Sequence, residues 1–440
     1  MDCSSSNNLS GFSKFNNIFK KNQSNEIVTS SIFKNNYQKK KIEYPNFTSS
    51  NLRKNIIIAV KNNPLVQASL LEIDSSKSSE KVVEAQNKPQ VNFQASAGAS
   101  RTDAENSIGA LGTLSVSKIL YDSGVINNNI MSQKLRTKAA IEELNNITQN
   151  LALNGYLAIN ELARTQMIER VYDRGLEMGG SLIEQIDNLS SSGVSDKTMI
   201  LKAQKEFTEL VVLSIQAKAA KKSAEINFKD FFQTTSIPNL ETLRPLEVGK
   251  LEKLSRKMVN YNPSIKVQNL IIESARSALR ASQNQKNPNV SLRAGINTPA
   301  EDILDNTSAN IGFVVNYIYD DGGRLDSQIE GINSQIKSTI KRRDDLIKGL
   351  NKQLDLSYES YLNATEAKIE LEKLIKLLKE TLDTSKAQLV TGRAKIQDVL
   401  KNELDLAKKK IDLISVNSSL VSASYNIKYL TSGIIPKITK

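Results

Sequence analysis

Most of this chain is present twice. Residues 63–229 recur as residues 262–428, at an offset of 199 positions that varies by one residue at most. The matching marks, in chain order, are Asn63-Pro64 and Asn262-Pro263, Pro89 and Pro288, Tyr121-Asp122-Ser123-Gly124 and Tyr319-Asp320-Asp321-Gly322, Gly193 and Gly392, and Ser223-Ala224 and Ser422-Ala423. This period is far longer than that of a solenoid repeat. The sequence therefore predicts two copies of one supersecondary module in a single pseudo-symmetric body of 440 residues.

The charge of the chain gives no sign of a nucleic-acid partner. Lys and Arg number 59 against 47 Asp and Glu, a formal net charge of +12. Beyond the first 54 residues the charges alternate in sign, whereas a nucleic-acid site needs clustered basic residues with interleaved aromatics. We interpret the excess as a cationic solvated surface.

The chain lacks residues that several classes of enzyme require. The chain has no His, no Trp and one Cys, so zinc sites, His-based nucleophilic catalysis and an internal disulfide are not expected. It has neither a glycine-rich phosphate loop nor a run of ~20 apolar residues that could span a bilayer as a helix. We predict no catalytic residue, no cofactor and no metal: the protein is not an enzyme.

The first 51 residues are dominated by Asn, Ser, Lys and Phe, and we expect a tail that is disordered or processed. Cys3, followed by three serines and Asn7, resembles the start of a mature bacterial lipoprotein. Asp2 is not the small residue that a lipoprotein cleavage site requires, and no apolar leader core is visible. The sequence leaves open whether the true start lies upstream with a signal peptide, and whether Cys3 carries lipid.

Each copy then carries one predicted β-hairpin, over residues 89–121 and 288–319. Val91, Phe93, Ala95 and Ala97 alternate with polar residues, as do Val290, Leu292, Ala294 and Ile296 in the second copy. Strands of roughly ten residues cross a bilayer when tilted. Alternation alone fits both a transmembrane barrel with a wet interior and a hairpin in a soluble sheet.

Two long helical hairpins dominate the rest. No proline interrupts residues 124–193 or 322–392, and apolar residues recur there at helical spacing. A helix of about 67 residues would be ~100 Å long. Returning helices are predicted over residues 199–232 and 399–430, with Gly193 and Gly392 at the turns. Coiled-coil seams account for the apolar residues at helical spacing. The four predicted strands of one chain cannot close a barrel, so a barrel would need strands from several chains.

Each copy has the order helix, β-hairpin, long helix, glycine tip and returning helix. This order, present twice, resembles that of the TolC-like outer-membrane channel family. The resemblance rests on the Asn-Pro pairs before each first helix, Pro89 and Pro288 at strand entry, and Tyr-Asp-x-Gly at strand exit. The second tip, Thr391-Gly392-Arg393-Ala394-Lys395-Ile396-Gln397-Asp398-Val399-Leu400, resembles the family's Gly-x-x-x-x-x-Asp-Val-Leu segment. The similarity covers roughly residues 52–433.

The resemblance implies a mixed fold, mostly α, in which long antiparallel helical hairpins build a periplasmic tunnel. Three chains with four strands each would form a twelve-stranded transmembrane β-barrel in the outer membrane of a Gram-negative bacterium. The first repeat would span residues 52–233, an equatorial linker 234–255, the second repeat 256–433 and a C-terminal tail 434–440. The implied partners are two further copies, outer-membrane lipid, a periplasmic adaptor and an inner-membrane efflux pump or ABC exporter.

The resemblance also implies an entrance at the helical tips. Asp398 would line it, with Arg393 and Thr391 beside it, and the second hairpin would move to open it. Lys401 departs from members that carry a second acid one turn past the first. The alternative for Asp398 is a solvated acid at the start of a helix, stabilised by the helix dipole. Docking of the adaptor or transporter is expected at Ser192, Gly193, Val194 and Gly392.

The predicted function is a passive exit duct, serving either drug efflux or type I protein secretion; the cargo, the pump and the resting state stay open. A porin-like channel is a weaker alternative, because porins have only short periplasmic turns. A second alternative is a periplasmic coiled-coil adaptor or structural protein without channel activity. Adaptors add a lipoyl-like β domain, and no such segment is visible here.

Overall fold

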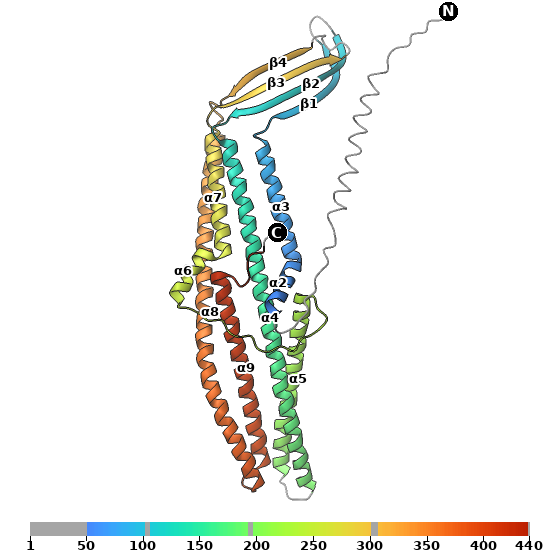
Figure 1. The fold of residues 1–440 in the computed structure, drawn as a ribbon, viewed down its shortest axis with the longest axis vertical. Coiled ribbons are helices and arrows are strands. Elements are labelled where there is room, and N and C mark those ends of the chain that lie inside the picture. The colour runs from blue at the N-terminus through green and yellow to red at the C-terminus, as the bar shows by residue number, and fades with distance from the viewer. Residues whose placement is uncertain (1–50, 102–105, 192–196, 301–306, 439–440) are drawn as a thin grey trace, which may run out of the picture. The chain divides into compact units, whose positions relative to one another are not determined.

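The computed structural model describes residues 51–101, 106–191, 197–300 and 307–438 (Figure 1). The chain divides into two units, residues 1–44 and 45–440, and every described residue belongs to the second. Ser192, Gly193, Val194 and Cys3 lie outside the described residues. Among the helices in the described ranges, none combines the length and hydropathy that crossing a membrane requires.

Each repeat begins with two helices separated at the Asn-Pro pair. Helices α2 (Leu52–Asn62) and α3 (Pro64–Ala85) open the first repeat, and α6 (Leu251–Tyr261) and α7 (Pro263–Asn284) open the second. The Asn63 carboxamide oxygen accepts a hydrogen bond from the amide of Leu65 at 2.9 Å, and Asn262 accepts one from Ser264 at 3.0 Å. Proline at the first helical position then costs no hydrogen bond. The chain therefore breaks between two helices at Pro64 in the first repeat and at Pro263 in the second.

The predicted strands form one antiparallel sheet. Its order is β1 (Gln90–Arg101), β2 (Asn106–Tyr121), β3 (Asn289–Ala300) and β4 (Ser308–Asn316). The two hairpins join along β2 and β3, so β1 and β4 are the edges of the sheet. The sheet lies at one end of α3, α4, α7 and α8 (Figure 1).

Four long helices follow the strands. Helices α4 (Val125–Ser191) and α8 (Arg324–Val390) have 67 residues each, and α5 (Lys197–Phe232) and α9 (Ile396–Ser432) return beside them. The Asp of the Tyr-Asp-x-Gly motif caps the start of the long helix that follows the motif. One carboxylate oxygen of Asp122 accepts from the amide of Gly124 and the other from that of Ile126. In the second copy Asp320 and Asp321 divide the same two tasks.

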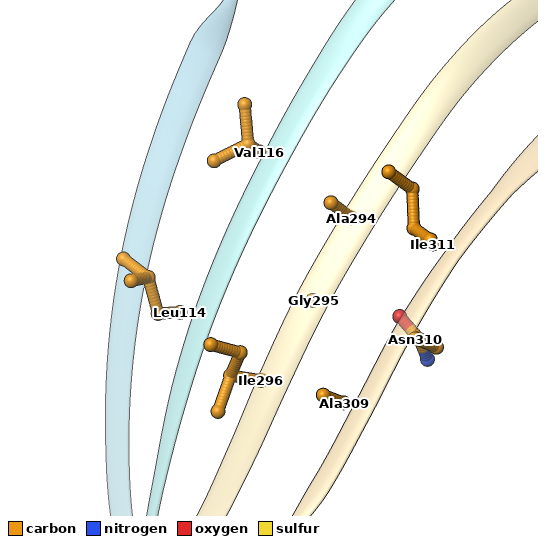
Figure 2. A pocket seen from close by; sticks show the side chains of 8 residues that line it. All are labelled: Leu114, Val116, Ala294, Gly295, Ile296, Ala309, Asn310 and Ile311. Carbon is orange, nitrogen blue, oxygen red and sulfur yellow. The ribbon is translucent and has the colours of Figure 1, made fainter.

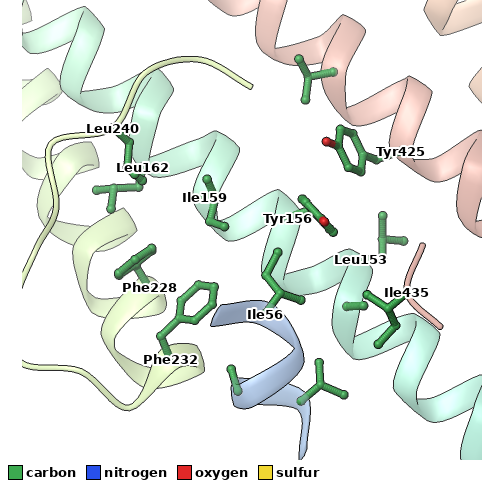
Figure 3. Packing of buried hydrophobic residues seen from close by; sticks show 14 of the residues in the cluster. Ile56, Leu153, Tyr156, Ile159, Leu162, Phe228, Phe232, Leu240, Tyr425 and Ile435 are labelled. Carbon is green, nitrogen blue, oxygen red and sulfur yellow. The ribbon is translucent and has the colours of Figure 1, made fainter. Parts of the chain in front are cut away.

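The largest apolar core lies where α2, α4, α5 and α9 meet (Figure 3). Phe228 and Phe232 on α5 are almost fully buried, and their rings pack 4.7 Å apart. Tyr156 on α4 lies 4.6 Å from the ring of Tyr425 on α9, so this core joins the first repeat to the second. Rings at such separations add stability beyond their buried area.

Two buried glutamines of α4 hold the extended segments that follow the returning helices. The carboxamide of Gln149 accepts hydrogen bonds from the amides of Ile434 and Ile435 and donates to the carbonyl of Ile435. Gln166 donates to the carbonyl of Pro238 and accepts from the amide of Leu240. Both segments leave regular structure, so their backbone groups need such partners when buried.

Candidate functional site

The sheet has two faces of opposite chemistry, and both are open in one chain. Cross-strand pairs place the apolar residues on one face, where Ile311 is 76% and Phe313 72% exposed. Val91, Phe93, Leu114 and Val116 share that face and are also exposed. The other face carries Asn, Gln, Ser and Thr. A sheet that exposes a continuous apolar face has an apolar neighbour in its working state.

A shallow hollow of about 320 Å³ indents the apolar face (Figure 2). It forms because Ala294 and Ala309 are short, whereas the surrounding Leu114, Ile296 and Ile311 are long. Its lining is almost wholly aliphatic and holds no titratable group. Such a surface suits hydrocarbon and offers a polar ligand little to bind.

The tip of the second hairpin is a glycine turn. Gly392 has φ +71°, in the left-handed region that favours glycine, and Gln388 accepts hydrogen bonds from the amides of Arg393 and Ala394. Thr391 donates its hydroxyl hydrogen to the same carbonyl at 3.0 Å. The chain reverses over the five residues between α8 and α9, and Gly392 lies in this turn, as predicted.

The three predicted entrance residues lie together at this tip. Thr391, Arg393 and Asp398 are all exposed, and Asp398 occupies the first turn of α9. Within the described part of the chain, neither Arg393 nor Asp398 forms an ion pair. They are therefore free to face water or a partner, and Asp398 is well placed to interact with the positive end of the helix.

Apolar residues next to these three in the sequence anchor the tip, which the sequence did not reveal. Ile396 and Leu400 are buried against Ala203 of α5, with Leu182 and Ile183 of α4 beside them. Val399 packs into the seam between α8 and α9. The two helical hairpins thus contact each other near their tips, and the charged residues project from a packed base.

One ion pair joins equivalent turns of the two hairpins. Lys408 on α9 lies 2.9 Å from Glu209 on α5, and these residues are 199 positions apart, the offset of the duplication. Their mutual hydrogen bond is the main cause that lowers the pKa of Glu209 and raises the pKa of Lys408. Both side chains are about 40% exposed, so solvent screens the pair and it contributes little to stability. It is one of several contacts between the two hairpins, beside the apolar clusters.

Two comparisons with known proteins agree with this architecture. The chain matches the family of outer membrane efflux proteins over residues 56–229 and 254–433. The break between the two matched segments coincides with the end of the first repeat. No curated protein is significantly similar in sequence.

Solved structures share the fold at low sequence identity. CusC is 14% identical, with a TM-score of 0.78 over 88% of this chain and 93% of that chain. A membrane protein from Pseudomonas aeruginosa is 15% identical, with a TM-score of 0.77 over 87% and 90%. The outer membrane protein VceC from Vibrio cholerae is 15% identical, with a TM-score of 0.77 over 87% and 96%. These likenesses confirm the fold predicted for the single chain, which is mostly helical with long helical hairpins and four strands.

Proposed function

This chain belongs to the outer membrane efflux protein family, and from that premise we propose that three copies form a passive channel through the outer membrane. The sheets would close into a twelve-stranded barrel, and the helical hairpins would continue it as a tunnel through the periplasm. An inner-membrane transporter and a periplasmic adaptor would deliver the cargo, which is a small molecule or a secreted protein.

The observation that carries this proposal is the interface between the two repeats. One chain forms this interface from its first repeat to its second, whereas the equivalent surfaces at the two ends of the series do not meet within the described part of the chain. Helix α4 of the first repeat packs against α7 of the second, and β2 pairs with β3. The equivalent contacts would join α8 to α3 and β4 to β1, which are the ends of the same series. A second copy can supply them, because a repeated head-to-tail contact closes into a ring when its rotation allows.

The burial of α3 and α7 supports this reading residue by residue. Ser274, Ser277 and Ala281 of α7 are at most 2% exposed, because α4 covers them. Their equivalents at the same offset are Ser75, Ser78 and Val82 of α3, all of which are exposed. Val82 has 67% of its surface open to solvent. The face of α3 that one chain leaves bare is thus the face that α7 buries.

A designed disulfide tests the ring. The hydroxyls of Ser132 on α4 and Ser274 on α7 are 3.0 Å apart, and their equivalents are Gly331 and Ser75. In a Cys3→Ser background, Gly331→Cys with Ser75→Cys should link neighbouring copies into a covalent trimer in outer-membrane fractions. Each single variant and the in-chain pair Ser132→Cys with Ser274→Cys are the controls, and they should leave the chain monomeric on denaturing gels.

The rival is a soluble periplasmic adaptor or structural protein. It predicts a monomer outside the membrane fraction and no disulfide between copies, and that result would refute the channel. The in-chain control guards against poor oxidation, since its cross-link forms whether or not chains associate.

The entrance belongs to the same proposal. Thr391, Arg393 and Asp398 would line it, and Gly392, with Ser192, Gly193 and Val194 at the other tip, would face the docking partner. Arg393→Ala and Asp398→Ala should change single-channel conductance in planar bilayers, because charges in a narrow opening set the local ion concentration. Asp345→Ala, at an exposed site on α8, is the control. Unchanged current and cation block in both tip variants would remove these residues from the constriction.

A further inference from the structure

Among the sheet positions with described side chains, a single charged residue lies on the polar face. In the sheet positions whose side chains the structure describes, that face carries Gln90, Asn92, Gln94, Ser96, Thr113, Ser115, Ser117, Asn289, Ser291, Arg293, Asn297, Ser308, Asn310 and Asn316 together with glycines and a few apolar residues. Arg293 is the fifth residue of β3 and the one member of this set with a formal charge. The charge is therefore not part of a mixed, self-neutralising surface.

The neighbours of Arg293 leave its guanidinium uncovered. Its cross-strand partners are Ser117 on β2 and Gly312 on β4, and the next residue on the same face of β3 is Gly295. A Cβ atom added at Gly312 would meet nothing within 4 Å. Arg293 itself is exposed, and across the described ranges it forms no ion pair. Small neighbours on three sides keep this positive charge both accessible and unneutralised.

A second cation, Lys118, lies next to Arg293 in the sheet and allows a direct comparison. Lys118 pairs with Leu292, one step along the same ladder from the pair between Ser117 and Arg293. Because successive residues of a strand point to opposite faces, Lys118 lies on the apolar face and Arg293 on the polar face. The two cations occupy neighbouring positions along the sheet and differ in the face from which they project.

We propose that Arg293 is a selectivity residue that draws anionic solutes into the exit of the channel. This inference rests on the proposed function, in which the polar face lines a water-filled lumen. Three copies would then place three guanidinium groups in one ring. Rings of basic side chains select anions in pores, and a confined, low-dielectric wall focuses their field.

Reversal potentials under a KCl gradient test the proposal in planar bilayers. Arg293→Gln should raise the ratio of K⁺ to Cl⁻ permeability by about twofold, and Arg293→Glu should raise it further. Arg293→Lys should keep the ratio of the unaltered chain, since it keeps the charge. The differences should shrink between 0.1 M and 1 M salt, where the screening length falls from about 10 to about 3 Å.

Lys118→Gln is the matched control, because it removes the same charge from the opposite face at nearly the same position. It should leave the permeability ratio unchanged. An unchanged ratio in Arg293→Gln, or an equal shift in Lys118→Gln, would overturn the assignment while the channel itself stands. Absence of any conductance from the unaltered chain would instead refute the proposed function. Arg293→Lys and Arg293→Glu separate a failure of Arg293→Gln to assemble from a loss of selectivity. Arg293→Lys should keep the ratio of the unaltered chain and Arg293→Glu should raise it, and equal ratios in these two variants would overturn the assignment.

Discussion

Helices α4 and α8 have the same length and the same place in their repeats, yet one is a central support and the other a bare edge. Helix α4 packs against α3, α5, α7 and α9, whereas α8 packs mainly against α7 and α9. Buried polar residues such as Thr148, Gln149 and Asn160 lie along α4. Helix α8 instead exposes Leu356, Ile369 and Leu377. Duplication thus preserved the element while its surroundings decided its role.

The difference shows how a repeat protein can leave an interface for a second copy. Within the chain, α4 has a neighbour on either side because a second repeat follows it. Helix α8 is the end of the series, so within the described residues no helix of a further repeat covers its corresponding face. Apolar residues exposed there are then expected at a site of association.

The largest expected effect on stability comes from replacing the glutamine of α4 that hydrogen-bonds the C-terminal segment. Gln149→Ala would leave the part-buried amide of Ile434 and the buried amide of Ile435 without an acceptor, at a cost of about 2–4 kcal/mol of unfolding free energy. Lys348 is the equivalent residue of α8 and is exposed, so Lys348→Ala should change stability by less than about 0.5 kcal/mol.

Urea unfolding in detergent, followed by circular dichroism, measures both variants. Equal midpoints for the two would show that α4 is no more of a structural support than α8. Limited proteolysis gives a second measure, since release of residues 433–438 should expose the C-terminus in Gln149→Ala alone.

The next test concerns the contact through which α4 supports the second repeat. Burial is the main cause that raises the pKa of Tyr425 to about 12, and Tyr156 adds to the shift. The folded protein keeps this proton while the unfolded chain releases it near pH 10. Stability from this group is therefore complete below pH 10 and is lost as the pH rises to about 12. The loss amounts to about 2–3 kcal/mol.

Tyr425→Phe removes this titration and keeps the ring contact with Tyr156. Its unfolding free energy should fall less steeply than that of the unaltered chain between pH 10 and 12, and should match it near pH 8. Parallel pH profiles for the two proteins would mean that Tyr425 is not shielded from water at the α4 contact.

The smallest expected effects come from Gly→Ala variants, whose changes in unfolding free energy should have opposite signs in α4 and α8. A Cβ at Gly155 of α4 would lie 2.7 Å from the ring of Phe231, so Gly155→Ala should cost about 1–3 kcal/mol. A Cβ at Gly349 of α8 would meet nothing within 4 Å, so Gly349→Ala should stabilise by about 0.5–1 kcal/mol through helix propensity. Thermal unfolding of both variants measures the signs. A loss of stability in Gly349→Ala would reveal a neighbour of α8 at that point.

The elements themselves were predictable because their signals are local. Asn63 and Asn262 cap the helices that follow them, Pro89 and Pro288 precede strands, and Gly392 makes the turn that its missing side chain permits. Hydrophobic alternation of period two assigned the strands, and the absence of proline over 67 residues allowed the long helices. Each of these effects acts within a few residues along the chain, so an amino-acid sequence displays them directly.

The packing of the elements was decided only by the tertiary structure. Nothing near Gln149 or Gln166 in the sequence indicates that their side chains hold backbone some 290 and 70 residues away. The sequence placed Asp398 and Arg393 at the tip, but the buried contacts of Ile396 and Leu400 with the first hairpin came from the fold. By itself, the sequence determined two equal copies and their elements. Their unequal surroundings depend on contacts between distant residues, for which local patterns carry no signal.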